Sequence, residues 1–333
     1  MNLASIKCIE YVLGENKISN NQLRDLNRNG YDIDKFEKKV GIKNRFISEN
    51  FTSLDLAHQA AEKLFQSNNI EKNKIDFLIL CTQSPEYLIP TNSCILQNML
   101  GLEENIGTFD YNLGCSGYIY GLSMAKGLIE TNQAKNVLLI TSETYSRYLN
   151  EEDYVNRLIF SDAASASIIV NEGKNQIKSF SFKTKGADFD KLIVKNNYFN
   201  KQLNPVLKKN GDYSKFTDNN LYMDGKSIFQ FTIKEVPNFI SQILEKNNLE
   251  ANEIDFFILH QPNKFLLESI RKRTKIPENK FLIDIENFGN TVSNTIPIVL
   301  KNKFSSLEKF DGKLLLCGFG VGLSLAGCII ENN

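Results

Sequence analysis

An internal repeat constrains the fold of this chain more than any other feature of its sequence. Residues 68–80 (NNIEKNKIDFLIL) are matched 179 positions later by residues 247–259 (NNLEANEIDFFIL). In both copies a helical pattern, a short polar loop and a buried strand follow in the same order. Two long copies do not make a solenoid, and a chance match in an Asn-, Lys- and Ile-rich sequence is the alternative. We predict two similar halves packed together, residues 1–172 and residues 173–333.

Short apolar runs alternate with helical patterns along the whole chain. Continuous apolar runs separated by helices favour an α/β fold whose strands are covered on both faces. The polar stretch 185–220 is weakly periodic and is predicted to be an insertion between the halves, either a cap over a site or a mobile loop,. The predicted strands are residues 75–80, 137–141, 164–170, 314–317 and 323–330.

The bulk composition excludes several classes of protein. Lys plus Arg and Asp plus Glu balance at 39 each, so no basic surplus points to nucleic acid,. The N-terminus does not match a signal peptide, and no run approaches the ~20 apolar residues of a membrane span, so we expect a soluble, cytoplasmic protein. The six cysteines form no CxxC pair, which argues against a zinc site or a disulfide scaffold,.

Cys115 differs from the other five cysteines in its surroundings. Residues 108–117 (TFDYNLGCSG) are predicted to run from a strand into a helix. Unpaired N–H groups and the positive end of the helix dipole favour a thiolate at such a place. A thiolate is a nucleophile, and its natural product is an acyl thioester. Taken alone, the pattern is equally compatible with a buried structural cysteine.

The chain has two histidines, and His260 is the better candidate for chemistry. It follows a predicted buried strand that Pro262 stops, and active-site groups favour strand ends in α/β folds,. His58 lies within a helical pattern and is predicted to be a surface or packing residue. A structural role for His260 is the alternative.

Two glycine-containing turns could complete a site. Residues 287–295 (NFGNTVSNT) lead into a predicted helix. Taken alone, their Asn and Gly residues would be explained as a turn that caps this helix,. Residues 317–324 (CGFGVGLS) superficially suggest a dinucleotide loop, but a strand follows them and a later acidic partner is missing,. We predict instead that this second turn directs a backbone N–H group into a site.

Cys115, His260, Asn290 and the second turn, in that order, resemble the β-ketoacyl-acyl-carrier-protein synthase III family of the thiolase superfamily. The resemblance spans nearly the whole chain and includes residues 40–45 (VGIKNR), 160–164 (FSDAA) and 223–229 (MDGKSIF). It implies a thiolase-like fold, with two similar halves in a layered αβαβα core. It also implies a homodimer and a reaction that needs no metal or redox cofactor.

The resemblance assigns roles to individual residues. Cys115 matches the acylated nucleophile, and His260 and Asn290 match the catalytic histidine and asparagine. The backbone N–H groups of Cys115 and Val321 match an oxyanion hole. Ile89 matches a side chain that closes the acyl pocket of the partner subunit. The expected substrate-binding residues are Ile89, Phe229, Asn263 and Phe319.

The chain departs from the family pattern around the predicted entrance to the site. It has no Trp, and Lys35 and Phe36 stand where a Trp often stacks on coenzyme A adenine. Pro262 stands in place of Ala, Phe265 in place of Arg, and Val321 in place of a common Gly. Primer recognition and carrier docking are therefore expected to differ. A basic rim for phosphopantetheine or an acidic carrier is expected at Lys39, Arg45, Lys272 and Arg273, unless these are solvated surface charges.

The implied reaction is a decarboxylating condensation that makes a 3-ketoacyl thioester. Acyl-CoA or acyl-carrier protein would donate the primer and malonyl-acyl-carrier protein the extender, for fatty-acid initiation or a specialised acyl chain. A plain acyltransferase acting on an alcohol or amine is one alternative, against which His260 and Asn290 argue. A hydroxymethylglutaryl-CoA synthase needs a Glu where Gln83 and Ser84 stand. A non-catalytic scaffold of the same fold is the third alternative.

Overall fold

The computed structural model describes residues 3–24, 30, 32–195, 217–304 and 306–332. Within them, ten strands form one sheet in the order β12-β11-β13-β14-β8-β1-β7-β6-β4-β5. These strands are β1 (Ser5–Leu13), β4 (Phe77–Cys81), β5 (Gly107–Tyr111), β6 (Asn136–Glu143), β7 (Ala163–Val170), β8 (Asn175–Thr184), β11 (Phe256–Leu259), β12 (Phe281–Leu282), β13 (Gly312–Gly320) and β14 (Ser324–Asn332).

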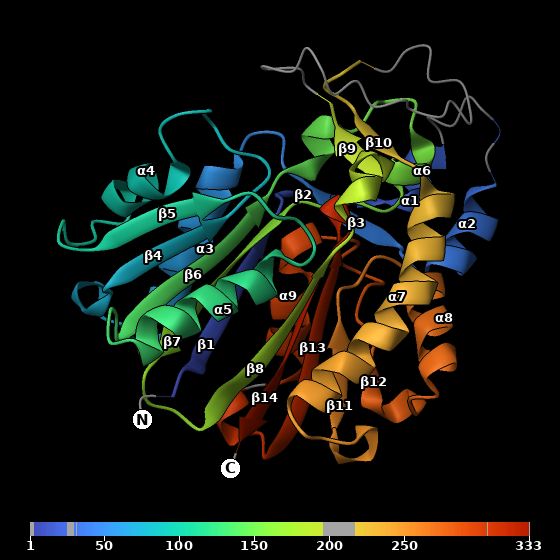
Figure 1. Cartoon of the computed structure of the whole chain (residues 1–333). Helices are drawn as coiled ribbons and strands as arrows, with labels where there is room; N and C mark the ends of the chain where they lie inside the picture. The colour runs from blue at the N-terminus through green and yellow to red at the C-terminus, as the bar shows by residue number, and fades with distance from the viewer. Residues whose placement is uncertain (1–2, 25–29, 31, 196–216, 305, 333) are drawn as a thin grey trace.

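The sheet consists of two runs of five strands with the same pairing pattern. In one, β4 pairs parallel with β5 and β6, and β7 and β1 follow antiparallel. In the other, β11 pairs parallel with β12 and β13, and β14 and β8 follow antiparallel. A single pairing of Ser5 with Gln176 joins them, and Figure 1 shows them as two fans of strands. The proposed boundary after residue 172 falls in the turn between β7 and β8 and stays a prediction.

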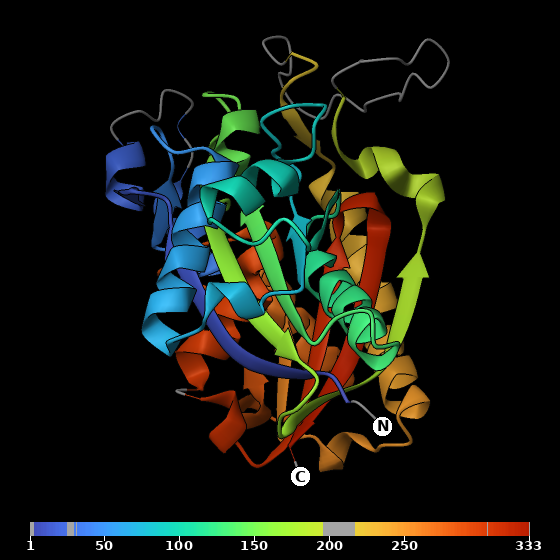
Figure 2. The ribbon, with the colours of Figure 1, turned by 90° about the vertical axis from the view of Figure 1, so that its left-hand side faces the viewer.

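The helices lie in three layers around the two runs of strands (Figures 1 and 2). Helices α5 (Gly117–Glu130) and α9 (Thr295–Lys303) lie between the runs, and one core contains residues of both helices and both runs. Helix α3 (Ser53–Asn68) covers the outer face of the first run, and α7 (Gly225–Lys246) and α8 (Lys264–Thr274) cover that of the second. The αβαβα arrangement expected from the sequence is therefore confirmed.

Strand alternation explains how one strand serves two layers. Ile79 of β4 packs into the inner core, whereas Leu78 and Leu80 pack into the outer core with α3. Successive side chains of a strand point to opposite faces, so a strand buried on both sides has to be apolar throughout. This is why the predicted strands appear in the sequence as unbroken apolar runs.

The two copies of the sequence repeat form equivalent elements. Helix α3, a 3-10 turn at Lys72–Lys74 and β4 correspond to α7, a 3-10 turn at Ala251–Glu253 and β11. The other α-helices and strands in the described residues are β2 (Asn16–Ser19), α1 (Asn20–Arg24), α2 (Ile33–Val40), β3 (Asn44–Ile47), α4 (Asn92–Met99), α6 (Tyr154–Arg157), β9 (Leu192–Val194) and β10 (Leu221–Met223).

Part of the predicted insertion at 185–220 lies outside the described residues. Its described portion contains a 3-10 segment at Gly186–Lys191 and strand β9, which pairs antiparallel with β10. Residues 196–216 are not described, so a cap over the site stays a prediction. None of the helices in the described part of the chain is both long and apolar enough to cross a membrane.

The packing of α5 against β6 can be tested with two glycines of the same helix. A Cβ on Gly121 would lie 2.4 Å from Leu139 Cδ1 and 2.5 Å from the Tyr111 hydroxyl, whereas one on exposed Gly127 meets nothing within 4 Å. We expect Gly121→Ala to destabilise the protein by about 1–3 kcal/mol through overpacking. Gly127→Ala should instead stabilise it by about 0.5–1 kcal/mol through helix propensity. Denaturant unfolding measures both, and a Gly121→Ala protein as stable as Gly127→Ala would contradict the inner-layer packing.

Candidate active site

Cys115 lies in the loop between β5 and α5, immediately before the helix. The loop turns tightly there, because the Gly117 N–H group donates to the Gly114 carbonyl at 2.7 Å. Gly320, at the end of β13, faces the cysteine: a Cβ at this position would lie 2.9 Å from Cys115 Sγ. The glycine turn after β13 is thus brought against the nucleophile, and glycine at 320 is required by that close approach.

Burial makes the Cys115 thiol a weak acid in the free protein. Desolvation is the largest influence and, with the negative charge of Glu143, raises its pKa to about 12. The N–H groups of Cys115 and Val321 lower the pKa, but they do not outweigh burial,. The thiolate predicted from the helix N-terminus is therefore wrong for the free protein. Both predicted oxyanion donors nevertheless act on the sulfur, as their effect on its pKa indicates.

His260 follows β11 and is held by contacts on two sides. Its Nδ1 lies 2.7 Å from the Thr295 hydroxyl, and that hydroxyl also donates to the Val292 carbonyl at 3.2 Å. The Phe319 ring packs at right angles to the imidazole, with 5.5 Å between centroids. Burial lowers the His260 pKa to about 3, so the ring is neutral at physiological pH. Thr295 was missed in the sequence, although it lies on the same turn as Asn290.

The amide of Asn290 has a defined orientation. Its Oδ1 accepts a hydrogen bond from the Val292 N–H group at 2.9 Å, which leaves Nδ2 as the donor available to the cavity. Val292 has φ of 57°, a left-handed conformation that is rare for a β-branched residue,. Such strain typically costs about 1–3 kcal/mol and persists only where the surroundings impose it. The turn is therefore held in a shape that orients Asn290.

Cys115, His260 and Asn290 line one small cavity of about 50 Å³, together with Phe319 and Val321. The three residues predicted to form the site are therefore brought together by the fold. A larger cavity of about 840 Å³ adjoins it and shares Tyr145, Leu192 and Val321 with it. The other apolar residues lining the small cavity include Phe160, Met223, Ile228, Phe231 and Leu266.

Two predicted substrate-binding residues, Phe229 and Asn263, line neither of these cavities, and neither does Ile89. Phe229 stacks on Phe265 with 5.5 Å between centroids, while Ile228 faces the small cavity because successive helical residues are rotated by about 100°,. The Asn263 side chain accepts from the Leu266 N–H group at 2.8 Å and caps α8. The predicted substrate contact of these two residues gains no support from this arrangement.

The predicted basic rim is only partly at the surface. Arg45 is 1% exposed, and its guanidinium donates to the Asn20 side chain, so its prediction as a rim residue is wrong. Burial also lowers its pKa to about 10. Lys39 is exposed and lies 4.9 Å above the Phe265 ring.

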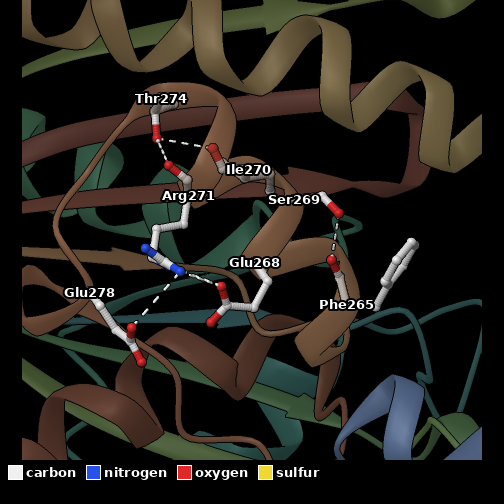
Figure 3. Close-up of polar contacts among 7 residues, drawn as sticks. All are labelled: Phe265, Glu268, Ser269, Ile270, Arg271, Thr274 and Glu278. Atoms are coloured by element: carbon white, nitrogen blue, oxygen red, sulfur yellow. Dashed lines mark hydrogen bonds and ion pairs between the residues drawn. The ribbon is translucent and has the colours of Figure 1, made fainter.

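Helix α8 carries the rest of that rim. Lys272 and Arg273 are exposed in its last turn, and their binding role stays a prediction. Figure 3 shows the neighbouring Arg271 directed at Glu268 and Glu278, while Phe265 extends from the other end of the helix. The Arg271 guanidinium is therefore paired with two carboxylates close to it on the surface.

Ile89 lies in the loop between β4 and α4 and is 83% exposed. The adjacent Tyr87 and Leu88 are 59% and 67% exposed and line the larger cavity. Three consecutive exposed apolar side chains beside a cavity are typical of a surface that another molecule covers. The predicted contact with a partner subunit stays a prediction.

Two family models match this chain. The model described as 3-oxoacyl-[acyl-carrier-protein] synthase III matches residues 109–186, which include Cys115. The model of the C-terminal part of that family matches residues 244–332, which include His260, Asn290 and Val321. The first match extends past residue 172 through β8, the second lies within the C-terminal half, and together they contain the candidate site.

Curated proteins and solved structures resemble the chain over nearly its full length. A β-ketoacyl-[acyl-carrier-protein] synthase III of Clostridium perfringens is 34% identical over 88% of this chain and 89% of its own length. One of Lactococcus lactis is 31% identical over 99% and 100%. A solved 3-oxoacyl-(acyl-carrier-protein) synthase III is 41% identical, with a TM-score of 0.91 and 99% of each chain covered. A synthase from Burkholderia xenovorans is 27% identical over 99% and 94%, with a TM-score of 0.89.

The burial of His260 predicts that its ring does not titrate near neutrality. We expect the chemical shifts of its imidazole to stay constant between pH 8 and pH 5. Even pH 5 is about two units above the pKa of about 3, so the ring stays neutral over this whole range,. Nuclear magnetic resonance of protein labelled at histidine measures this, and the His58→Gln variant assigns the signal because the chain has two histidines. A midpoint near pH 6 for His260 would contradict the buried, neutral imidazole.

Proposed function

The chain belongs to the 3-oxoacyl-[acyl-carrier-protein] synthase III family, and from this premise we propose how its own residues carry out the reaction. The enzyme is an acyltransferase that condenses an acyl primer with malonyl-acyl-carrier protein to begin fatty-acid synthesis. The observation that carries the residue assignment is that Cys115, His260 and Asn290 line one cavity. In addition, the Val321 N–H group acts on the cysteine sulfur.

In the first half-reaction, Cys115 accepts the primer. Its sulfur attacks the carbonyl carbon of an acyl thioester, the thiol proton passes to the leaving thiolate, and a new thioester forms. The N–H groups of Cys115 and Val321 donate to the oxyanion of the tetrahedral intermediate. Donors already in place need no reorganisation during the reaction, and each is typically worth about 3 kcal/mol of barrier.

In the second half-reaction, a malonyl thioester loses CO₂. The electron pair of the broken carbon–carbon bond forms an enolate, whose oxygen accepts from Asn290 Nδ2 and His260 Nε2. The tautomer with its proton on Nε2 is the one that donates, and in it the single proton of the Thr295 hydroxyl is directed at Nδ1 instead of at the Val292 carbonyl. The enolate carbon attacks the Cys115 thioester, the carbon–sulfur bond breaks to release Cys115 as a thiolate that takes up a proton from solvent, and the 3-ketoacyl thioester leaves.

The assignment of Asn290 is tested by separating the two half-reactions. We expect Asn290→Ala to form the acyl-enzyme normally but to condense about 100-fold more slowly, since one enolate donor is lost. Mass spectrometry of Cys115 measures the acyl-enzyme, and CO₂ release measures the condensation. Asn302→Ala is the control, because Asn302 lies on α9 and bonds Tyr11 and Asp284 outside the cavity.

The outcomes of this experiment also distinguish the alternative reaction. If the unaltered enzyme forms the acyl-enzyme and releases no CO₂, the condensation is refuted, which favours the alternative of transfer to an alcohol or amine. Equal losses of both half-reactions in Asn290→Ala would remove Asn290 from the enolate site.

A homodimer is also part of this proposal. Strand β5 is at an edge of the sheet, and an edge strand offers unpaired backbone groups to another chain,. The exposed loop with Tyr87, Leu88 and Ile89 follows the neighbouring strand β4 and borders the larger cavity. A second copy on this edge would bury the loop and bring Ile89 against the partner's cavity.

The dimer proposal predicts the effect of a charge at position 89. We expect the unaltered protein to have twice the chain mass of 37.9 kDa in solution. The Ile89→Glu variant should be monomeric and much less active, because burying a carboxylate in an apolar contact is costly. Light scattering after gel filtration measures the mass. Phe182→Glu is the control, since Phe182 is a 47% exposed residue of β8. A monomeric unaltered protein, or a dimeric Ile89→Glu, would refute this interface.

A further inference from the structure

Glu143 is a buried carboxyl group that the reaction scheme does not use. It is the last residue of β6, at the carboxyl end of that strand, and it is 0% exposed. The hydrogen bonds that it accepts come from neutral groups, and the charged group acting on it most is another carboxylate, Asp162. Burying a carboxyl group without a cation is costly, so its presence at this place needs a physical reason.

The hydrogen bonds of Glu143 connect two loops that border the site. Two donors come from the loop after β4, the Gln83 N–H group at 3.0 Å and the Ser84 hydroxyl at 3.1 Å. A third comes from the opposite half of the molecule, the Ser293 hydroxyl at 3.3 Å. One carboxyl group therefore links a loop of the first half to the Asn290 turn of the second.

On one side these contacts lead to the nucleophile. The Gln83 side chain donates to Asn112 Oδ1 at 2.8 Å and accepts from the Tyr145 hydroxyl at 2.6 Å. A Cβ on Gly114 would lie 2.6 Å from Gln83 Oε1, so Gln83 packs against the residue just before Cys115. Glu143 thus holds the Gln83 backbone, and the Gln83 side chain contacts the segment from which Cys115 projects.

On the other side they lead to the enolate donor. Ser293 follows Val292, whose left-handed backbone orients the Asn290 amide. The Thr141 hydroxyl of β6 donates to Asn294 Oδ1 at 2.6 Å, so β6 holds both residues after Val292. Strained backbone of this kind persists only where neighbouring contacts impose it.

We propose that Glu143 is a positioning residue, whose buried carboxyl group fixes the spacing between Cys115 and Asn290 by joining the Gln83 loop to the Asn290 turn. This inference rests on the proposed function, because it concerns the geometry of that reaction. A misplacement of about 1 Å between reacting groups can cost about 100-fold in rate. The condensation step, which needs both loops in register, depends on Glu143 more than the acylation of Cys115 does.

The charge of Glu143 can be detected through the pKa of Cys115, a quantity that a purely structural role of Glu143 would not change. Burial raises the pKa of Glu143 to about 8, so the neutral acid predominates at pH 7, and in that state its O–H donates to one of the two serine hydroxyls, Ser84 or Ser293, which then accepts instead of donating. The titratable groups that interact with it are Asp162 and the side chains of Cys81, Cys115 and Tyr145. Above about pH 8 its negative charge opposes thiolate formation at Cys115. Gln at 143 is always neutral and should therefore lower the Cys115 pKa.

The first experiment compares the two half-reactions in four variants. We expect Glu143→Ala and Ser293→Ala to condense about 10- to 100-fold more slowly while acylating Cys115 within about threefold of the unaltered enzyme. Glu143→Gln should restore condensation to within about threefold, since its amide can accept from Gln83 and donate to Ser293. Ser293→Ala keeps the carboxyl group, so the test does not depend on the folding of Glu143→Ala. Glu10→Gln is the control, because Glu10 is buried but paired with Lys63 and Lys301.

The second experiment measures iodoacetamide labelling of Cys115 against pH, by peptide mass spectrometry and without substrate. We expect the labelling profile of Glu143→Gln to lie at lower pH than that of the unaltered enzyme and of Glu10→Gln. An unshifted profile, equal losses of both half-reactions, or variants that condense normally would overturn the role of Glu143. If the unaltered enzyme neither acylates nor releases CO₂, the proposed function itself fails, and the positioning role of Glu143 that rests on it is overturned with it.

Discussion

The enclosure of α5 and α9 between two sheet faces is the constraint on which the rest of the structure depends. The N-terminal halves of both helices expose little surface to solvent. Their side chains must therefore be apolar, and small where the helix meets the strands, as Gly121 is against Leu139. Helix ends carry unpaired N–H groups that need partners, and a buried end has no water to supply them. The polar turns before the two helices therefore meet inside the molecule, and these turns carry Cys115 and Asn290.

The same burial sets the chemistry of the site. It raises the pKa of Cys115 and lowers that of His260, so both groups are neutral in the free enzyme. A dry cavity also strengthens each hydrogen bond to a developing oxyanion or enolate. The cost of this arrangement is that every polar group behind the site needs a partner. Pairs across the two halves provide them: Ser116 with Ser324, Thr141 with Asn294, and Glu143 with Ser293.

Much of this architecture could be predicted from the sequence, because it depends on local patterns. The repeat at residues 68–80 and 247–259 indicated two similar halves, and unbroken apolar runs indicated strands covered on both faces. Cys115, His260 and Asn290 each follow a strand or precede a helix, where such groups gather in α/β folds. Arg45 was predicted wrongly because no local pattern reveals that a surface-like basic residue is buried beside Asn20.

The sequence by itself determined which residues could react and that two halves would carry them. Only the tertiary structure decided their state and spacing. The thiol of Cys115 is protonated because desolvation outweighs the hydrogen bonds from the Cys115 and Val321 N–H groups, and burial is a property of the whole fold,. Thr295 and Glu143 matter through contacts with residues 35 to 150 positions away in the chain, and such contacts leave no periodic signal. The physical reason is that hydrogen bonds and burial away from water depend on which groups are close in space, whereas sequence patterns report only on neighbours along the chain.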